Sequence, residues 1–209
     1  MNKKDFNWLE IARELQALAQ TGLAFSNDNY DTERYNRLTE IASEITANYS
    51  NYDAEVLKEI FLSHPGYATP KIDVRAAVVN DKGELLLVQE RTDERWAMPG
   101  GWADVGDKPS EVAERETIEE SGYIVKAKKL VAVFDANRNG RPMEFFHAFK
   151  IIFLCDLIGG EAKTSNETMD AGFFAFNDLP PLSENRTNRK HLDEIKLHLL
   201  DSNRLATFD

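Results

Sequence analysis

Three glutamates, Glu116, Glu119 and Glu120, stand close together in the middle of the chain. On a helix this spacing places the three carboxylates on one face, where they repel one another. Gly122 predicts the C-terminal end of that helix, where the helix dipole disfavours anions. A hard divalent cation would offset both costs, because such ions prefer carboxylate, carbonyl and water oxygens. A solvated acidic face explains the same spacing without a ligand, so spacing alone leaves a metal site and a plain surface open.

The glutamates belong to a longer motif that resembles the Nudix box. That family pattern is Gly, five residues, Glu, seven residues, then Arg-Glu-hydrophobic-any-Glu-Glu-any-Gly-hydrophobic. The matching positions are Gly101, Arg115, Glu116, Glu119, Glu120, Gly122 and Tyr123. Asp107 replaces the first glutamate, which keeps the charge but shortens the side chain by one methylene and puts the bracing of the loop in question. Thr117 stands where an aliphatic residue is usual.

The resemblance covers about residues 71–203 and implies an α/β/α sandwich around a mixed sheet. It also implies a Mg²⁺-dependent pyrophosphohydrolase that cuts a nucleoside diphosphate linked to a group X into a nucleoside monophosphate and X-phosphate. The preceding helical segment is similar to that of a bacterial Nudix subgroup that acts on substrates such as ADP-ribose or CDP-choline.

The resemblance also implies roles for the motif residues. Glu116 and Glu120 would bind Mg²⁺ directly, with Mn²⁺ as an alternative, and the carbonyl of Gly100 would add a neutral oxygen. Glu119 would bind a second ion or a metal-bound water, and Arg115 would orient the carboxylates. The cation would bridge two phosphates and lower the pKa of the attacking water.

Four further residues have both a functional and a structural interpretation. Glu167 resembles the later-loop candidate for the general base, and is otherwise an ordinary loop residue. Arg75 could contact a phosphate or ribose, or form a salt bridge with Asp73. Trp96 and Phe134 could stack on a base, or pack in the core.

The N-terminal third of the chain has helical periodicity. Apolar residues recur at intervals of three and four over residues 1–64, which predicts three helices, the second with Asp31 as its N-cap. Pro65 and Pro70 then precede a change to strand patterns. We therefore expect a small helical domain at 1–64 and a Nudix hydrolase domain at 65–209.

The second domain interleaves strands and helices without a regular repeat, which predicts an α/β (α+β) fold with a mixed sheet covered by helices. Two strands separated by Asp81-Lys82-Gly83 predict a hairpin, and Asn139-Gly140 predicts another turn. A helix is expected at Pro109–Ser121 and another around Leu192, Ile195 and Leu199. The expected strands are Val74–Asn80, Glu84–Glu90, Tyr123–Phe134, Phe145–Leu157 and Phe173–Phe176.

Composition limits the classes of function. The longest apolar runs are too short for a membrane span, and charges interrupt any signal-peptide core. The single cysteine, Cys155, fits a reducing cytoplasm. A net charge of −11 argues against a broad nucleic-acid-binding face. We therefore expect a cytoplasmic enzyme acting on a small nucleotide.

Two competing functions and an oligomeric state follow from the same observations. The Nudix fold could serve as a non-catalytic nucleotide-sensing module, although the glutamates are all present. An RNA-processing phosphohydrolase could use the basic residues Arg186, Arg189 and Lys190. About 64 residues of helix bury only a marginal core alone, which predicts that they pack against another surface, in a homodimer or as a cap on the catalytic domain.

Overall fold

A computed structural model describes residues 8–136 and 145–209, and its contacts divide these residues into two units. The first unit holds residues 8–70 together with residues 145–147, and the second holds the remainder. The domain boundary between residues 64 and 65 stays a prediction, and the expected turn at Asn139-Gly140 lies outside the described residues. No helix among the described residues is both long and apolar enough to cross a membrane.

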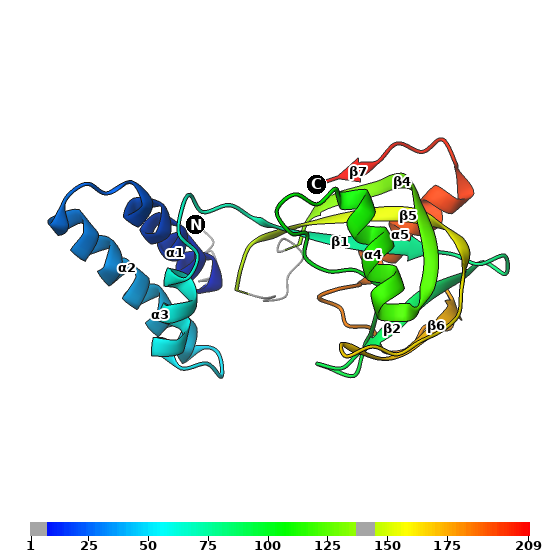
Figure 1. The fold of residues 1–209 in the computed structure, drawn as a ribbon, viewed down its shortest axis with the longest axis horizontal. Helices are drawn as coiled ribbons and strands as arrows, with labels where there is room; N and C mark the ends of the chain where they lie inside the picture. The colour runs from blue at the N-terminus through cyan, green and yellow to red at the C-terminus, as the bar shows by residue number, and fades with distance from the viewer. Residues whose placement is uncertain (1–7, 137–144) are drawn as a thin grey trace, which may run out of the picture. The chain divides into compact units, whose positions relative to one another are not determined.

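The first unit contains the three predicted helices, α1 (Trp8–Phe25), α2 (Asn29–Asn48) and α3 (Ala54–Leu62) (Figure 1). The prediction that Asp31 caps α2 is wrong, because the cap is Asp28. The Asp28 carboxylate accepts the backbone N–H of Asp31 at 2.9 Å. Asp31 instead lies in the first turn, where a negative charge is favourable.

The core of the helical unit includes a residue from much later in the chain. The ring of Phe145 stacks on Phe61 at 4.5 Å between ring centroids, and its carbonyl accepts a hydrogen bond from Arg13 Nε. The strand predicted to start at Phe145 therefore starts three residues later, at Ala148. Phe145 is apolar enough to continue a strand, but the same property lets it complete a second core.

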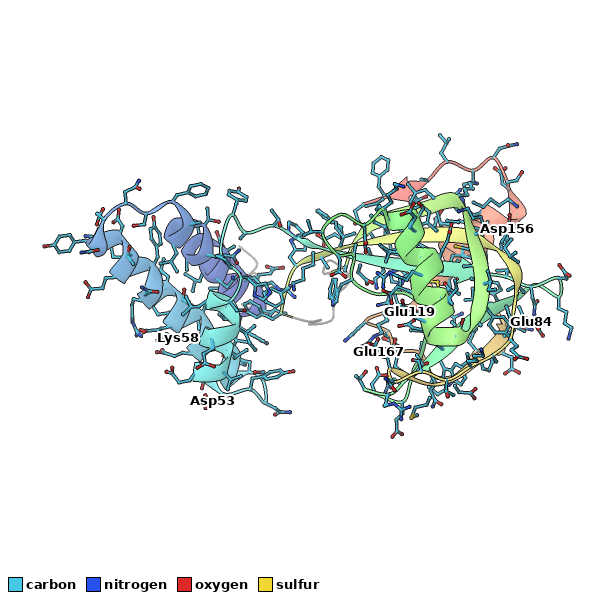
Figure 2. The ribbon with its side chains drawn as sticks, viewed as in Figure 1. Asp53, Lys58, Glu84, Glu119, Asp156 and Glu167 are labelled. Atoms are coloured by element: carbon cyan, nitrogen blue, oxygen red, sulfur yellow. The ribbon has the colours of Figure 1, made fainter. Side chains whose placement is uncertain are left out.

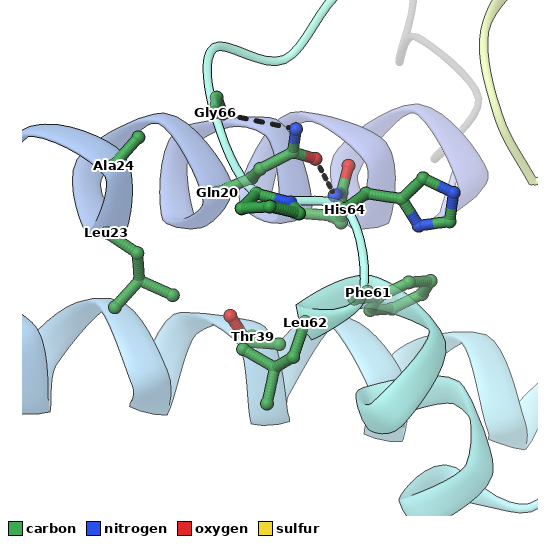
Figure 3. Close-up of a pocket in the computed structure, with 10 residues that line it drawn as sticks. Gln20, Leu23, Ala24, Thr39, Phe61, Leu62, His64 and Gly66 are labelled. Atoms are coloured by element: carbon green, nitrogen blue, oxygen red, sulfur yellow. Dashed lines mark hydrogen bonds between the residues drawn. The ribbon is translucent and has the colours of Figure 1, made fainter.

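A small pocket of about 120 Å³ opens between α1, α2 and the segment after α3 (Figure 3). Its polar groups bond to one another: Gln16 Nε2 donates to Gln20 Oε1 at 2.7 Å, and Gln20 Nε2 donates to the Gly66 carbonyl at 3.2 Å. The buried Thr39 hydroxyl donates to the carbonyl of Tyr35. These groups of the pocket wall are therefore satisfied from within the unit.

The second unit contains two sheets. The first is mixed, with the strand order β1 (Lys71–Val78), β5 (Ala148–Gly160), β4 (Tyr123–Asp135) and β7 (Thr207–Phe208). The second is antiparallel, with the order β3 (Trp96–Ala97), β2 (Glu84–Glu90) and β6 (Thr168–Ala175). The short strands β3 and β7 were not predicted, because two residues are too few for a periodic signal.

The predicted hairpin between β1 and β2 is wrong as a pair of strands. The turn forms, with the N–H of Asn80 bonded to the Glu84 carbonyl at 3.0 Å, but among the described residues the pairing beyond it is limited to an isolated bridge between Val79 and Leu85. β1 pairs in parallel with β5 on one edge. The loop at residues 99–103 occupies its other edge through three backbone hydrogen bonds of 2.9–3.0 Å. β2 is therefore free to join the second sheet.

Helices α4 (Pro109–Ser121) and α5 (Arg189–Leu200) pack against different apolar clusters of the sheets (Figure 1). Alternation along β1 separates these clusters: Val74 and Ala76 pack with α4, whereas Ala77 packs with α5. Since successive side chains of a strand point to opposite faces, the helices cover the two faces. The predicted α/β/α sandwich with a mixed sheet is confirmed.

Candidate active site

Helix α4 forms where its local signals predict it. Pro109 occupies the first turn, and Gly122 ends the helix with φ 77°, its N–H bonded to the Ile118 carbonyl at 2.9 Å. Thr117 is fully buried, and its hydroxyl donates to the Ala113 carbonyl at 2.7 Å. The departure of Thr117 from the motif is therefore accommodated within the helix.

A glycine pair brings backbone against the acidic end of α4. The N–H of Gly100 donates to Glu120 Oε2 at 2.8 Å. Gly100 has φ 143°, and a Cβ there would overlap the Val74 carbonyl of β1, so only glycine fits. No hydrogen bond to the carbonyl oxygen of Gly100 comes from the residues that the structure describes. That oxygen is therefore a ligand of the kind that a divalent cation accepts.

Glu116 lies against the next glycine. A Cβ on Gly101 would come within 3.1 Å of Glu116 Oε2, tighter than most real Cβ contacts. The side chain of Glu116 is 12% exposed, and Glu120 as a residue is 5% exposed. The two carboxylates therefore lie beside the Gly100-Gly101 backbone, largely removed from water.

Burial raises the pKa of both carboxyl groups. Desolvation is the main cause that raises the pKa of Glu120 to about 8, and the charges of Glu90 and Glu116 add to it. Arg75 and the Gly100 N–H oppose this shift without cancelling it. Desolvation is also the main cause that raises the pKa of Glu116; Arg115 opposes this shift, and Glu119 and Glu167 add to it. The protein therefore disfavours the ionised form of both groups, and a bound cation would stabilise that form.

Arg115 holds the outer part of the motif together. Its guanidinium lies 2.7 Å from Glu116 and 3.5 Å from Glu119. Asp107 Oδ2 lies 3.2 Å from the same guanidinium. It also accepts a hydrogen bond from the backbone N–H of Asp104 at 3.2 Å. An aspartate at position 107 is thus long enough to brace the loop.

The donor chemistry fits a divalent cation, but the ligands are not gathered around one point. No group of three or more His, Cys, Asp or Glu within residues 8–136 and 145–209 is arranged to hold a metal ion. Arg115 pairs with both Glu116 and Glu119. Metal binding would require these glutamates to exchange the guanidinium for the ion.

Glu167 lies on the loop before β6, exposed to solvent, and its charge contributes to raising the pKa of both Glu116 and Glu90 (Figure 2). Glu90, at the end of β2, is 6% exposed and also raises the pKa of Glu120. The fold therefore brings a loop and a strand end into electrostatic range of α4.

The three residues expected to contact substrate have structural partners. Arg75 is buried, with its Nε 2.8 Å from Asp73 and its Nη1 3.2 Å from the Met98 carbonyl. The half-buried Trp96 packs edge-on against Phe174 at 4.7 Å between ring centroids. Phe134 is only 1% exposed. These positions match the structural interpretations, and the substrate-binding roles of Arg75, Trp96 and Phe134 stay predictions.

Three charged residues near the motif were not predicted from the sequence: Glu90, Arg91 and Lys150. Lys150 is buried, with its Nζ 2.5 Å from Asp73. A lysine inside an apolar strand could have indicated a buried ion pair. Glu90 and Arg91 follow a shift in register between β2 and β6. Such bulges redirect side chains and leave no trace in apolar periodicity.

The basic residues that favoured an RNA substrate are mostly committed to partners. Arg186 lies 3.1 Å from Glu90, and Lys190 lies 2.8 Å from Asp209 and over the ring of Phe134. Paired cations release fewer phosphate counterions on binding nucleic acid, so the structure adds no support to that alternative.

An α/β/α sandwich with a glycine turn against an acidic helix end defines a phosphate-anhydride hydrolase of the Nudix class. The model of the NUDIX domain matches residues 69–195, and that of the "UDP-X-like, N-terminal oligomerisation domain" matches residues 7–61. The chain belongs to the Nudix hydrolase family, whose members generally use a divalent metal ion.

Relatives cover the whole chain. A Bacillus subtilis (strain 168) protein provisionally named ADP-ribose pyrophosphatase YjhB is 40% identical over all of both chains. A crystal structure of UDP-X diphosphatase is 34% identical with a TM-score of 0.62, over 97% of this chain and 98% of the other. An ADP-ribose pyrophosphatase structure from Streptococcus suis is 37% identical with a TM-score of 0.59, over 68% of this chain and 100% of the other.

Proposed function

We propose that the protein is a Mg²⁺-dependent pyrophosphohydrolase of nucleoside diphosphates linked to a second group X, with ADP-ribose, UDP-X and CDP-choline as the classes to test. The products are a nucleoside monophosphate and X-phosphate. The observation that carries this proposal is the buried pair Glu116 and Glu120, with raised pKa values, beside the Gly100 carbonyl, to which no described residue donates a hydrogen bond. The names of the relatives support ADP-ribose or a UDP-linked substrate.

In this proposal, Glu116, Glu120 and the Gly100 carbonyl hold Mg²⁺ or Mn²⁺, and Glu119 holds a second ion or its water. The metal supplies activation of water and neutralisation of the leaving phosphate. Arg115 orients Glu116 and Glu119, consistent with its contacts to both. Glu167 accepts the proton of the attacking water, supported by its electrostatic proximity to Glu116.

A screen of nucleoside diphosphate derivatives with Mg²⁺ tests the activity. Phosphate should be released only when a phosphatase is added, because the first products are phosphomonoesters. The Glu120→Gln protein should give no signal in the same assay. Orthophosphate released from ADP-ribose without the phosphatase would contradict cleavage within the pyrophosphate.

The proposal includes a homodimer formed through the helical unit, in the cytoplasm. The match of residues 7–61 to an oligomerisation domain supports the assembly, and exposed apolar side chains of that unit, including Leu18, Phe25 and Tyr30, supply area for it. The free, buried Cys155 is consistent with a reducing compartment. Light scattering of the full chain should give about twice the monomer mass. A monomer at micromolar concentration would remove the dimer from the proposal.

A further inference from the structure

Arg91 binds four successive carbonyls of the loop that carries Glu167. Its backbone N–H donates to the Glu167 carbonyl at 2.9 Å, and its Nε donates to the Asn166 carbonyl at 3.1 Å. Its Nη2 donates to the carbonyls of Ser165 and Thr168, each at 3.3 Å. Every carbonyl from Ser165 to Thr168 is thus bonded to one residue at the end of β2.

The same loop is closed internally and tied to α4. Ser165 Oγ accepts the N–H groups of Glu167 and Thr168, both at 3.1 Å. The fully buried Thr168 donates its hydroxyl to the Glu120 carbonyl at 2.7 Å. The loop is therefore fastened to β2 through Arg91 and to the last turn of the acidic helix through Thr168.

Arginine is suited to this task because its rigid fork presents several donors in one plane. Among the described residues, the structure shows no ion pair between Arg91 and a carboxylate, although Glu90 adjoins it in the chain. The guanidinium thus serves the loop backbone. A lysine at this position has one flexible ammonium, which cannot reproduce the fork geometry.

We propose that Arg91 is a positioning residue that holds the Glu167 carboxylate at the distance from the acidic helix that proton transfer requires. This role rests on the proposed function, since it gives Glu167 a task in water activation. Small displacements of a reacting group reduce turnover by up to about 100-fold, so a loop held at four carbonyls is a way to prevent them.

The test compares Arg91→Ala, Arg91→Lys and Glu167→Gln with the double variant Arg91→Ala/Glu167→Gln, using the full chain with Mg²⁺ and the best substrate of the screen. Arg91→Ala should lower kcat by about 10-fold or more and leave KM within about twofold, because the metal and phosphate contacts stay in place. Arg91→Lys should fall between Arg91→Ala and wild type. In the Glu167→Gln background, Arg91→Ala should cause no further loss.

Arg95 provides the matched control. It is an exposed arginine in the turn after β2, and the described residues give its side chain no hydrogen bond or ion pair. Arg95→Ala should retain wild-type kcat. Hydrogen exchange at the amides of Glu167 and Thr168 should accelerate in Arg91→Ala and stay unchanged in Arg95→Ala.

Three results would overturn the positioning role: a wild-type kcat in Arg91→Ala, an equal loss in both backgrounds, or full activity of Glu167→Gln. In each of these cases the wild-type enzyme still cleaves its substrate, so the proposed hydrolase activity survives, and only the third result also removes Glu167 as its general base. If wild type cleaves no nucleoside diphosphate derivative, the proposed function fails and the positioning role fails with it.

Discussion

Two clusters of buried charge share Arg75 as a neighbour, and they differ in how their charge is balanced. In the first, the Asp73 carboxylate lies 2.8 Å from Arg75 and 2.5 Å from Lys150. Burial opposes ionisation of Asp73, but the attraction of the two cations outweighs it and lowers the pKa of Asp73. In the second, the pKa of Glu120 rises to about 8, mainly through burial, because Arg75 compensates only part of the cost.

This difference in charge balance indicates that the first cluster is structural and the second functional. Lys150 Nζ also donates to the carbonyls of Asn185 and Arg186, so the first cluster ties β1 and β5 to the segment before α5. It needs no external partner. In the second cluster burial favours the protonated form of Glu120, and a bound cation would favour the ionised form instead.

The largest expected effect separates the clusters by activity. Glu120→Gln or Glu116→Gln should lower turnover by about 10³-fold or more, because a ligand of the activating cation is lost. Circular dichroism should show an intact fold, since glutamine is close to glutamate in size and keeps an acceptor oxygen. Glu111→Gln, on the exposed first turn of the same helix, is the control and should remain active. An active Glu120→Gln enzyme would refute the metal-site assignment.

The stability of the fold should depend on the first cluster and not on the second. Asp73→Asn should lower the free energy of unfolding by about 3 kcal/mol or more, because it leaves Arg75 and Lys150 buried without their carboxylate. Urea denaturation at pH 7 measures this, with Glu120→Gln as the contrasting variant, which should be no less stable than wild type without metal. A loss below about 1 kcal/mol for Asp73→Asn would mean that this cluster is not structural.

Added Mg²⁺ should stabilise the protein through the second cluster, which contains Glu116 and Glu120. At about 100 times its dissociation constant, Mg²⁺ should raise the free energy of unfolding of wild type by about 2.7 kcal/mol. A chelator should return the melting temperature to its starting value, and Glu120→Gln should show little response. Equal stabilisation of both proteins by Mg²⁺ would place the ion elsewhere.

A smaller effect concerns His191, whose buried ring lies within electrostatic range of Lys150 and Arg75 of the first cluster. Burial first, and then Lys150, lower the pKa of His191 to about 3 from 6.5. Its Nδ1 accepts the Asn188 N–H at 3.2 Å, which requires a neutral ring. Because the unfolded state binds more protons than the folded state between these values, stability is lost as pH falls from 6.5 towards 3.

His191→Gln keeps an acceptor for the cap of α5 but cannot titrate. The variant should therefore lose less stability on acidification, by up to about 1.4 kcal/mol per pH unit in that window. Urea denaturation at pH 4 and pH 7 measures the difference. Identical pH slopes for the two proteins would show that His191 is not held neutral by the fold.

Much of the fold could be predicted because its signals are local. Pro109 and Gly122 fix the ends of α4 within their own turns, and the bounds of that helix are confirmed. The β1–β2 hairpin and the start of β5 were wrong for the opposite reason. Which partner a strand joins, and whether Phe145 serves a sheet or a helical core, depends on competition with distant segments.

By itself, the sequence determined that three carboxylates share a helix face, because helical spacing is a property of the chain. Only the tertiary structure decided which charges are neutralised. Asp73 meets Lys150 across 77 positions of sequence, whereas Glu120 gains Glu90 as a further negative neighbour. Burial and the placement of distant strands set that balance, because electrostatic energy depends on distance and solvent access.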